Sequence, residues 1–375
     1  MGRLIVGNLD CEIELARSAY RRATHPDISN TVAKVISAAA LRLTAFAKPN
    51  DTLWTPRPIP ADALGRVPGA EDLNLVSGSL EKLIESPPSA SAILAWGETE
   101  TIAKLRGVAV APVEDSDPVE LGTNASSAAD RAKANPPRPP QDWTKLLWSV
   151  HPSTRVARDC NHRGFAYAFA RRRGLALPGA ALLQSSAAVD AHIAGGGAAS
   201  SRSQSWVLKA PFSAAGRERI RHKGPLEGEV KVHANRLFER YRLLLFEPWM
   251  ERLADFGAAG FIDKNGSVSV FQPHRLETDS SGVFRAIIIA DSDWPIHMSD
   301  DEHDSAVATA AAVGEALSEV GFRGPFSVDS YAYRDRKGRR RFHPLCEINA
   351  RLTFGHVARA WSERLNQPHY ELRLD

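Results

Sequence analysis

Three polar side chains near the C-terminus are spaced so that one β-strand would present them together. They are Glu347, Asn349 and Arg351. Because side chains alternate along a strand, residues two positions apart point to the same face. A carboxylate and an amide oxygen are hard ligands that suit Mg²⁺, and a guanidinium group suits a phosphate or a carboxylate. The stretch 347–351 therefore predicts a strand face that binds a metal ion and an anion.

A second carboxylate, Asp329, lies upstream in a stretch that also favours a strand. Between the two stretches, residues 335–338 are typical of a hairpin turn. Antiparallel pairing would bring Asp329 close to Glu347 and Asn349. We expect these three residues to ligate a Mg²⁺ ion that carries a nucleotide. For the stretch 347–351 taken alone, the alternative is the solvent-exposed face of an edge strand.

Lys209 offers a phosphate contact at the end of another predicted strand, 206–209. The small residues of the loop 213–216 follow it. Such a loop lets backbone N–H groups approach phosphate oxygens closely, and the lysine adds a point charge. The basic run 217–223 comes next, and it fits either a solvated face or a lid over a polyphosphate. A surface position is the alternative for Lys209.

The segment 247–250, Glu-Pro-Trp-Met, follows the apolar stretch 243–246. A carboxylate at this point can bind ribose hydroxyls, and apolar neighbours can hold an adenine. Pro248 lacks a backbone donor and ends the strand, as a hinge between domains would. The alternative is a strand-to-loop corner with a buried tryptophan.

Bulk composition limits the classes of partner. The 375 residues carry 47 basic and 44 acidic side chains, and the resulting net charge of +3 is too balanced to indicate nucleic-acid binding. No apolar run approaches the roughly 18 residues of a membrane span, and the first residues do not fit a signal peptide. Three scattered cysteines fit a reduced, cytoplasmic protein. On a regular strand, Cys346 would point away from Glu347 and into the core.

The elements that position these residues divide the chain into an α/β part and an α+β part. Alternating strands and helices over 3–106 predict a small parallel α/β module, with a mix of helix and strand over 33–46. The Pro-, Asp- and Ser-rich stretch 112–142 predicts a boundary. Beyond it, the apolar patterns predict strands at 206–209, 243–246, 258–262, 268–271 and 285–290, and helices at 164–173, 226–241 and 303–320.

In this order, the segments 206–209, 213–216 and 247–250, then Asp329 and 347–351, resemble the ATP-grasp superfamily. The resemblance covers about residues 150–375. It implies a nucleotide clamped between two α+β subdomains, after an N-terminal module similar to a pre-ATP-grasp domain. The implied division is an N-terminal domain 1–115, a connection 116–149, a lid-side subdomain 150–248 and a C-terminal subdomain 249–375 with the metal site.

The resemblance also implies a role for each motif. Lys209 would bind the α- and β-phosphates, and Arg351 would face the γ-phosphate or an acyl phosphate, so both count as catalytic. The other implied contacts are the loop residues Ser213, Gly216 and Arg217 over the phosphates, Glu247, Pro248, Trp249 and Met250 around the adenosine, and Asp329, Glu347 and Asn349 on Mg²⁺ or Mn²⁺.

The activity implied is that of an ATP- and Mg²⁺-dependent carboxylate–amine (or thiol) ligase that forms an acyl phosphate and releases ADP and phosphate. Its partners would be small-molecule carboxylates and amines, with no nucleic acid and no membrane; a homodimer stays open. The alternatives are a non-catalytic nucleotide-binding protein and a kinase-like phosphotransferase on the same fold. One departure is the second, upstream phosphate-binding lysine, for which Lys133 and Lys145 are the nearest candidates.

Overall fold

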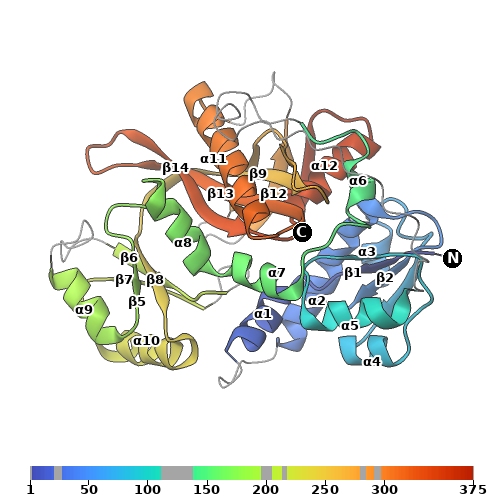
Figure 1. Ribbon diagram of the computed structural model, residues 1–375, viewed down its shortest axis with the longest axis horizontal. Coiled ribbons are helices and arrows are strands. Elements are labelled where there is room, and N and C mark those ends of the chain that lie inside the picture. The colour runs from blue at the N-terminus through green and yellow to red at the C-terminus, as the bar shows by residue number, and fades with distance from the viewer. Residues whose placement is uncertain are drawn as a thin grey trace.

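Three β-sheets organise the chain, as the ribbon of the computed structural model shows (Figure 1). The structure describes residues 2–20, 28–110, 138–195, 205–212, 218–278, 284–290 and 297–374. A parallel sheet near the N-terminus, a small antiparallel sheet and a seven-stranded sheet follow one another along the chain. Every helix in these ranges is too short or too polar to span a bilayer.

The N-terminal module, residues 2–110, contains the parallel sheet in the order β3-β2-β1-β4, which confirms the predicted parallel α/β module. Its strands are β1 Leu4–Val6, β2 Thr52–Thr55, β3 Asn74–Ser77 and β4 Ile93–Ala95, and its helices are α1 Cys11–Ala19, α2 Asn30–Ala40, η1 Leu41–Phe46, α3 Ala61–Leu64, α4 Leu80–Glu85 and α5 Glu100–Ala109. The expected strand within 33–46 is wrong. Ser29 caps an alanine-rich helix there, with its hydroxyl accepting from the Val32 N–H at 3.2 Å.

The small sheet has the antiparallel order β5-β8-β6-β7. Its strands are β5 Ala181–Leu183, β6 Ser205–Lys209, β7 Arg219–Lys223 and β8 Leu244–Pro248. Two helices, α9 Ser186–Ala194 and α10 Gly228–Tyr241, lie beside the sheet (Figure 1) and share its apolar core. The strands predicted at 206–209 and 243–246 are confirmed.

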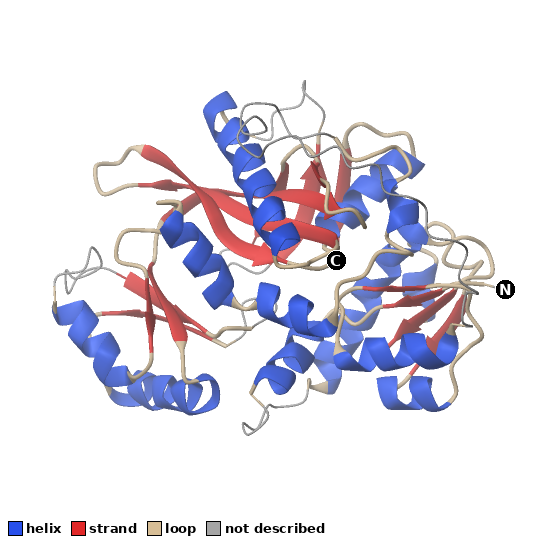
Figure 2. Cartoon of the chain, in the orientation of Figure 1, coloured by secondary structure: helices blue, strands red, loops and turns tan. Residues whose placement is uncertain are grey.

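The large sheet runs in the order β14-β13-β9-β11-β12-β15, and β10 pairs with β9. Its strands are β9 Glu251–Ile262, β10 Val268–Val270, β11 His274–Thr278, β12 Phe284–Ile289, β13 Gly324–Arg334, β14 Arg340–Asn349 and β15 Tyr370–Arg373. The helices packed around it are α6 Trp143–Leu146, α7 Thr154–Asn161, α8 Arg163–Arg172, α11 Asp300–Glu319 and α12 Phe354–Arg364, as Figure 2 shows. The chain passes from the small sheet to the large sheet where β8 leads into β9.

Two hairpins of the large sheet turn at glycines, and the second is the one predicted at 335–338. β9 and β10 turn at Gly266, whose φ is +88°, and β13 and β14 turn at Gly338, whose φ is +75°. Glycine adopts this left-handed backbone without steric cost. In the second turn, Asp335 accepts from the backbone N–H groups of Lys337 and Arg339 at 2.9 Å each. The predicted pairing of the metal-ligand strands is therefore confirmed.

The cores show how the parts join. One apolar cluster contains Leu41 and Trp96 of the N-terminal module together with Leu352 and Trp361 beside the large sheet. A second cluster joins Ala166 and Phe169 of α8, among others, to the opposite face of the large sheet. The division at 115, 149 and 248 stays a prediction. The N-terminal module and the C-terminal part share one apolar core.

Candidate active site

The β13–β14 hairpin brings the three predicted metal ligands together. Asp329 pairs directly with Glu347, and Ser327 pairs with Asn349. The Asn349 amide Nδ2 donates to Asp329 Oδ2 at 3.2 Å. Directly opposed residues in an antiparallel ladder point to the same face, so two carboxylates and one amide share a single patch of the sheet.

The two carboxylates of this patch repel each other where they meet. Burial, together with the neighbouring charge of Glu347, raises the pKa of Asp329 to about 7. No group of three or more His, Cys, Asp or Glu side chains suited to a metal occurs in the described ranges, so the oxygen donors are two carboxylates and Asn349. Such a set fits a small hard cation that keeps waters and phosphate oxygens as its other ligands.

Lys209 reaches this region from the small sheet. It ends β6, as predicted, and its Nζ lies 2.5 Å from the Glu247 carboxylate on β8 and 3.9 Å from the Cys346 sulfur on β14. Burial alone would raise the pKa of Glu247, but the ammonium group of Lys209 holds it below its usual range. Glu247 thus serves as the counter-ion of Lys209 here, while its contact with ribose stays a prediction.

Three arginines surround the same space. Arg219 belongs to the basic run 217–223 of the sequence analysis, whereas Arg163 and Arg252 were not singled out there. Arg163 begins α8, and its Nη2 lies 2.7 Å from Glu347 Oε1. Arg252 on β9 lies 2.6 Å from Asp255. Burial and the nearby guanidinium groups of Arg252 and Arg163 lower the pKa of Arg219. Cations that repel one another while sharing a few carboxylates form a site suited to a polyphosphate.

Arg163 supplies a cation upstream of Lys209, where the sequence suggested Lys133 or Lys145. Lys145 lies on α6, is exposed, and pairs with Asp142 at 3.6 Å. Lys133 lies outside the described residues. Arg163 is the first residue of a helix and has no strand or glycine-rich loop next to it in the sequence, so no local pattern indicated it.

The structure describes only some of the other residues predicted to contact the nucleotide. Ser213, Gly216 and Arg217 lie outside the described residues. Pro248 ends β8, as expected. Trp249 and Met250 form the short connection from β8 to β9 and are half-buried, and the guanidinium group of Arg221 lies 4.2 Å from the centre of the Trp249 ring.

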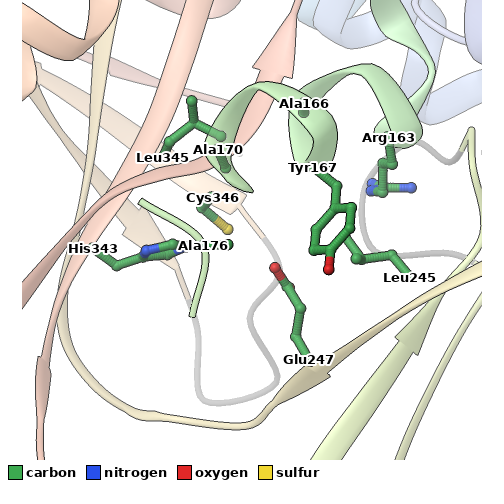
Figure 3. A pocket seen from close by; sticks show the side chains of 10 residues that line it. All are labelled: Arg163, Ala166, Tyr167, Ala170, Ala176, Leu245, Glu247, His343, Leu345 and Cys346. Carbon is green, nitrogen blue, oxygen red and sulfur yellow. The ribbon is translucent and has the colours of Figure 1, made fainter. Parts of the chain in front are cut away.

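A narrow recess lies between α8, β8 and β14. Figure 3 shows Glu247 from β8 pointing into it together with His343 and Cys346 from β14. The expectation that Cys346 lies in the core opposite Glu347 is wrong. Between Asp329 and Tyr331 the ladder partner shifts from Glu347 to His343, so β14 contains extra residues and the alternation of its side chains is broken.

Arg351 follows β14 and is held from two sides. Its Nη2 donates to Asn349 Oδ1 at 3.0 Å and lies 2.6 Å from Glu12 Oε1. Glu12 belongs to α1 of the N-terminal module and is buried. The contacts Glu12–Arg351, Arg351–Asn349 and Asn349–Asp329 therefore connect the first helix to the candidate metal site, which the sequence alone did not indicate.

Solved structures with a similar fold are known. A biotin carboxylase–β-γ-ATP complex from Campylobacter jejuni matches 94% of this chain and 66% of its own, with a TM-score of 0.53 and 11% identity. An N5-carboxyaminoimidazole synthetase from Staphylococcus aureus, complexed with ADP, matches 94% of this chain and 72% of its own, with a TM-score of 0.49 and 11% identity.

No protein-family model matches the chain. No curated protein matches its sequence. The structural likeness nevertheless confirms the fold that the motifs predicted: the chain has the ATP-grasp fold, preceded by a parallel α/β module.

Proposed function

We propose that this protein is an ATP- and Mg²⁺-dependent ligase that joins a carboxylate to an amine through an acyl phosphate. The carrying observation is the juxtaposition of two groups of side chains. Asp329 stands directly opposite Glu347 beside Asn349 on the large sheet, and Lys209, Arg163 and Arg252 gather next to them. Oxygen donors beside converging cations are what the transfer of a phosphoryl group from Mg²⁺-ATP requires.

The chemistry proceeds in two steps. An oxygen of the substrate carboxylate attacks the γ-phosphorus of ATP, the bond to the bridging oxygen breaks, and ADP leaves. The amine nitrogen then attacks the acyl carbon of the acyl phosphate, expels inorganic phosphate and loses a proton. A thiol would follow the same path. Because the protein adds no covalent chemistry, positioning and charge neutralisation provide the rate enhancement.

Asp329, Glu347 and Asn349 would hold Mg²⁺, which when bound neutralises charge between the β- and γ-phosphates. Lys209 would contact the α- and β-phosphates, with Glu247 keeping its ammonium group in place. Arg163 would provide the second upstream cation, because it begins α8 and already reaches Glu347 at 2.7 Å. We place the base and the sugar at the mouth of the narrow recess beside Tyr167, Leu245 and Glu247.

The test is incubation with Mg²⁺-ATP and a pooled panel of amino acids and small carboxylates, with ADP, AMP and phosphate measured separately. Release of ADP and phosphate that depends on the pool, together with a hydroxamate when hydroxylamine replaces the amine, supports the proposal. Formation of AMP would rule out an acyl phosphate. A stable phosphorylated product without hydroxamate would indicate a kinase-like transfer.

Asn349→Ala separates a ligase from a nucleotide-binding protein without turnover. We expect it to abolish ADP release and to leave the circular dichroism spectrum unchanged. Asn74→Ala is the matched control, because Asn74 is exposed and its amide donates only to the Asn50 carbonyl at 3.2 Å among the described contacts. Equal ADP release by both variants would contradict the assignment of Asn349.

A further inference from the structure

A buried donor without an acceptor lies where the N-terminal module meets the large sheet. Trp96 follows β4 at the carboxyl end of the parallel sheet, and its carbonyl accepts from the Leu352 N–H at 3.1 Å. Its side chain is buried with 4% of the residue exposed, and its indole Nε1 has no acceptor in the described part of the chain. Buried indole N–H groups usually have a partner, so this one indicates a place for a ligand or water.

Three of the four other buried tryptophans in the described residues show the usual situation. The indole N–H donates to Glu363 in Trp143, to the Gly224 carbonyl in Trp206 and to the Arg42 carbonyl in Trp361. Trp96 differs from them although it is equally enclosed.

A second unpaired donor lies beside it. The Nε of Arg351 is buried and also lacks an acceptor among the described residues, while its two terminal nitrogens contact Leu352, Asn349 and Glu12. The guanidinium carbon of Arg351 lies 5.5 Å from the centre of the Trp96 ring. A carboxylate has two oxygens and carries negative charge, so one carboxylate can accept from both groups.

Aromatic side chains continue from this point. The ring of Phe354 lies 4.7 Å from that of Trp96, and the ring of Phe284 stacks on Phe354 at 5.8 Å with an angle of 10° between the planes. Both phenylalanines are half-buried. Flat, partly exposed apolar rings favour another planar apolar group.

We propose that Trp96 and Arg351 bind the carboxylate of the acid substrate, and that an aryl group of this acid lies against Phe354 and Phe284. The proposal rests on the proposed function for calling the ligand a substrate. Arg351 also contacts Asn349, which contacts Asp329, so a carboxylate held by Arg351 lies next to the site proposed for the γ-phosphate. Glu12 acts as a positioning residue, because it holds Arg351 from the other side.

The test follows the indole N–H directly, with ¹⁵N-labelled tryptophan in the full-length protein and 3-phenylpropanoate as the probe. The Trp96 resonance is the one missing from the spectrum of Trp96→Phe. We expect a saturable downfield shift of this resonance, while those of Trp143, Trp206 and Trp361 stay in place because their N–H groups are already bonded. The uncharged amide, 3-phenylpropanamide, should not produce the shift.

Two variants test the parts of the site, with affinity read by saturation-transfer NMR. Trp96→Phe keeps a ring but removes the donor, and we expect affinity for 3-phenylpropanoate to fall roughly ten- to hundredfold. Phe354→Leu should weaken binding about three- to tenfold. Phe342→Leu is the matched control; Phe342 packs on Phe256 and should not affect the probe.

A Trp96 resonance that does not move at millimolar 3-phenylpropanoate overturns the proposal, as does an equal response to the acid and its amide. The titration needs neither ATP nor turnover. A saturable shift without any acid-dependent ADP release would therefore uphold the carboxylate site and end the ligase proposal. Acid-dependent ADP release without a shift of the Trp96 resonance would uphold the ligase proposal and overturn the carboxylate site.

Discussion

At the scale of single residues, the most consequential contact is the buried ion pair between Lys209 and Glu247. Its two members come from adjacent strands of the small sheet and approach to 2.5 Å. A buried pair contributes little net stability, but removal of one partner leaves an uncompensated charge in a poorly solvated place. The pair therefore fixes Lys209 in position, ready for a phosphate.

Lys209→Met should lower the free energy of unfolding by about 3–5 kcal/mol, because Glu247 is left buried and unpaired. The double variant Lys209→Met/Glu247→Gln should recover most of this loss, yet neither protein should bind ATP with the affinity of the wild type. Urea denaturation and calorimetric titration with Mg²⁺-ATP measure the two quantities. Normal ATP binding by the double variant would contradict the role of Lys209.

The burial of His274 determines the direction in which the stability of the protein changes with pH. Burial, with the nearby charge of Arg359, lowers the pKa of His274 to about 3, whereas a histidine in the unfolded chain titrates near 6.5. Between these values the unfolded chain binds the proton and the folded protein does not. Stability therefore falls as the pH falls, by about 1.4 kcal/mol per pH unit from this residue.

His274→Gln should remove this contribution to the pH dependence of stability. The difference in unfolding free energy between the wild type and the variant should shift by about 2 kcal/mol between pH 6.5 and pH 5.0, with the wild type losing more. The other buried histidines are present in both proteins and cancel. Denaturation curves that keep a constant separation across this range would show that His274 takes up its proton in the folded state.

At the scale of elements, the β13–β14 hairpin could be predicted from the sequence, whereas its irregularity could not. The turn chemistry around Asp335 and Gly338 and the spacing of Glu347, Asn349 and Arg351 are local signals. The shift of partner between Asp329 and Tyr331 is fixed by packing across the sheet, and that shift places Cys346 in the recess.

One position of the central strand β9, Gly257, has no room for a side chain. Gly257 pairs with both Asp329 and His274, and a Cβ atom there would lie 2.5 Å from the His274 ring. The imidazole therefore occupies the space over the strand next to the candidate metal ligand. The strand predicted from the sequence began at residue 258 and did not include Gly257, and nothing in the sequence reveals what approaches this position.

Gly257→Ala should lower the free energy of unfolding by about 1–3 kcal/mol through this clash. The three atoms nearest to such a Cβ all belong to the His274 ring, so Gly257→Ala/His274→Ala should cost less than the sum of the two single changes. Denaturation of all four proteins measures the coupling. Additive losses would mean that the strand backbone, and not the histidine, opposes the methyl group.

At the scale of the whole molecule, the order of motifs predicted the ATP-grasp fold, but not how its parts share residues. Arg163, Glu12 and Trp96 approach the candidate site from α8, α1 and the end of β4, far apart in the sequence. Each contact depends on docking between elements, for which a single sequence holds no periodicity or spacing signal. The sequence therefore indicated candidates within the motifs, and it did not indicate the residues that helices and other strands bring next to them.

The shared core makes a prediction about how the molecule unfolds. Leu41 of η1 is fully buried in the cluster that also contains Leu352 and Trp361, whereas Leu105 of α5 is fully buried in a cluster confined to the N-terminal module. Each Leu→Ala change should lower the free energy of unfolding by about 2–5 kcal/mol. The two changes should differ in where the protection of backbone amides is lost.

Leu41→Ala should accelerate hydrogen exchange in α12 and β15 as well as in β1 and β2, because it weakens the cluster through which these elements pack. Leu105→Ala should act mainly on the N-terminal module. The two variants are compared by hydrogen exchange with mass spectrometry, under conditions in which they have the same free energy of unfolding. Faster exchange confined to residues 4–95 in Leu41→Ala would show that the N-terminal module opens on its own. The contacts of Glu12 and Trp96 with Arg351 would then not be held in place by the shared core.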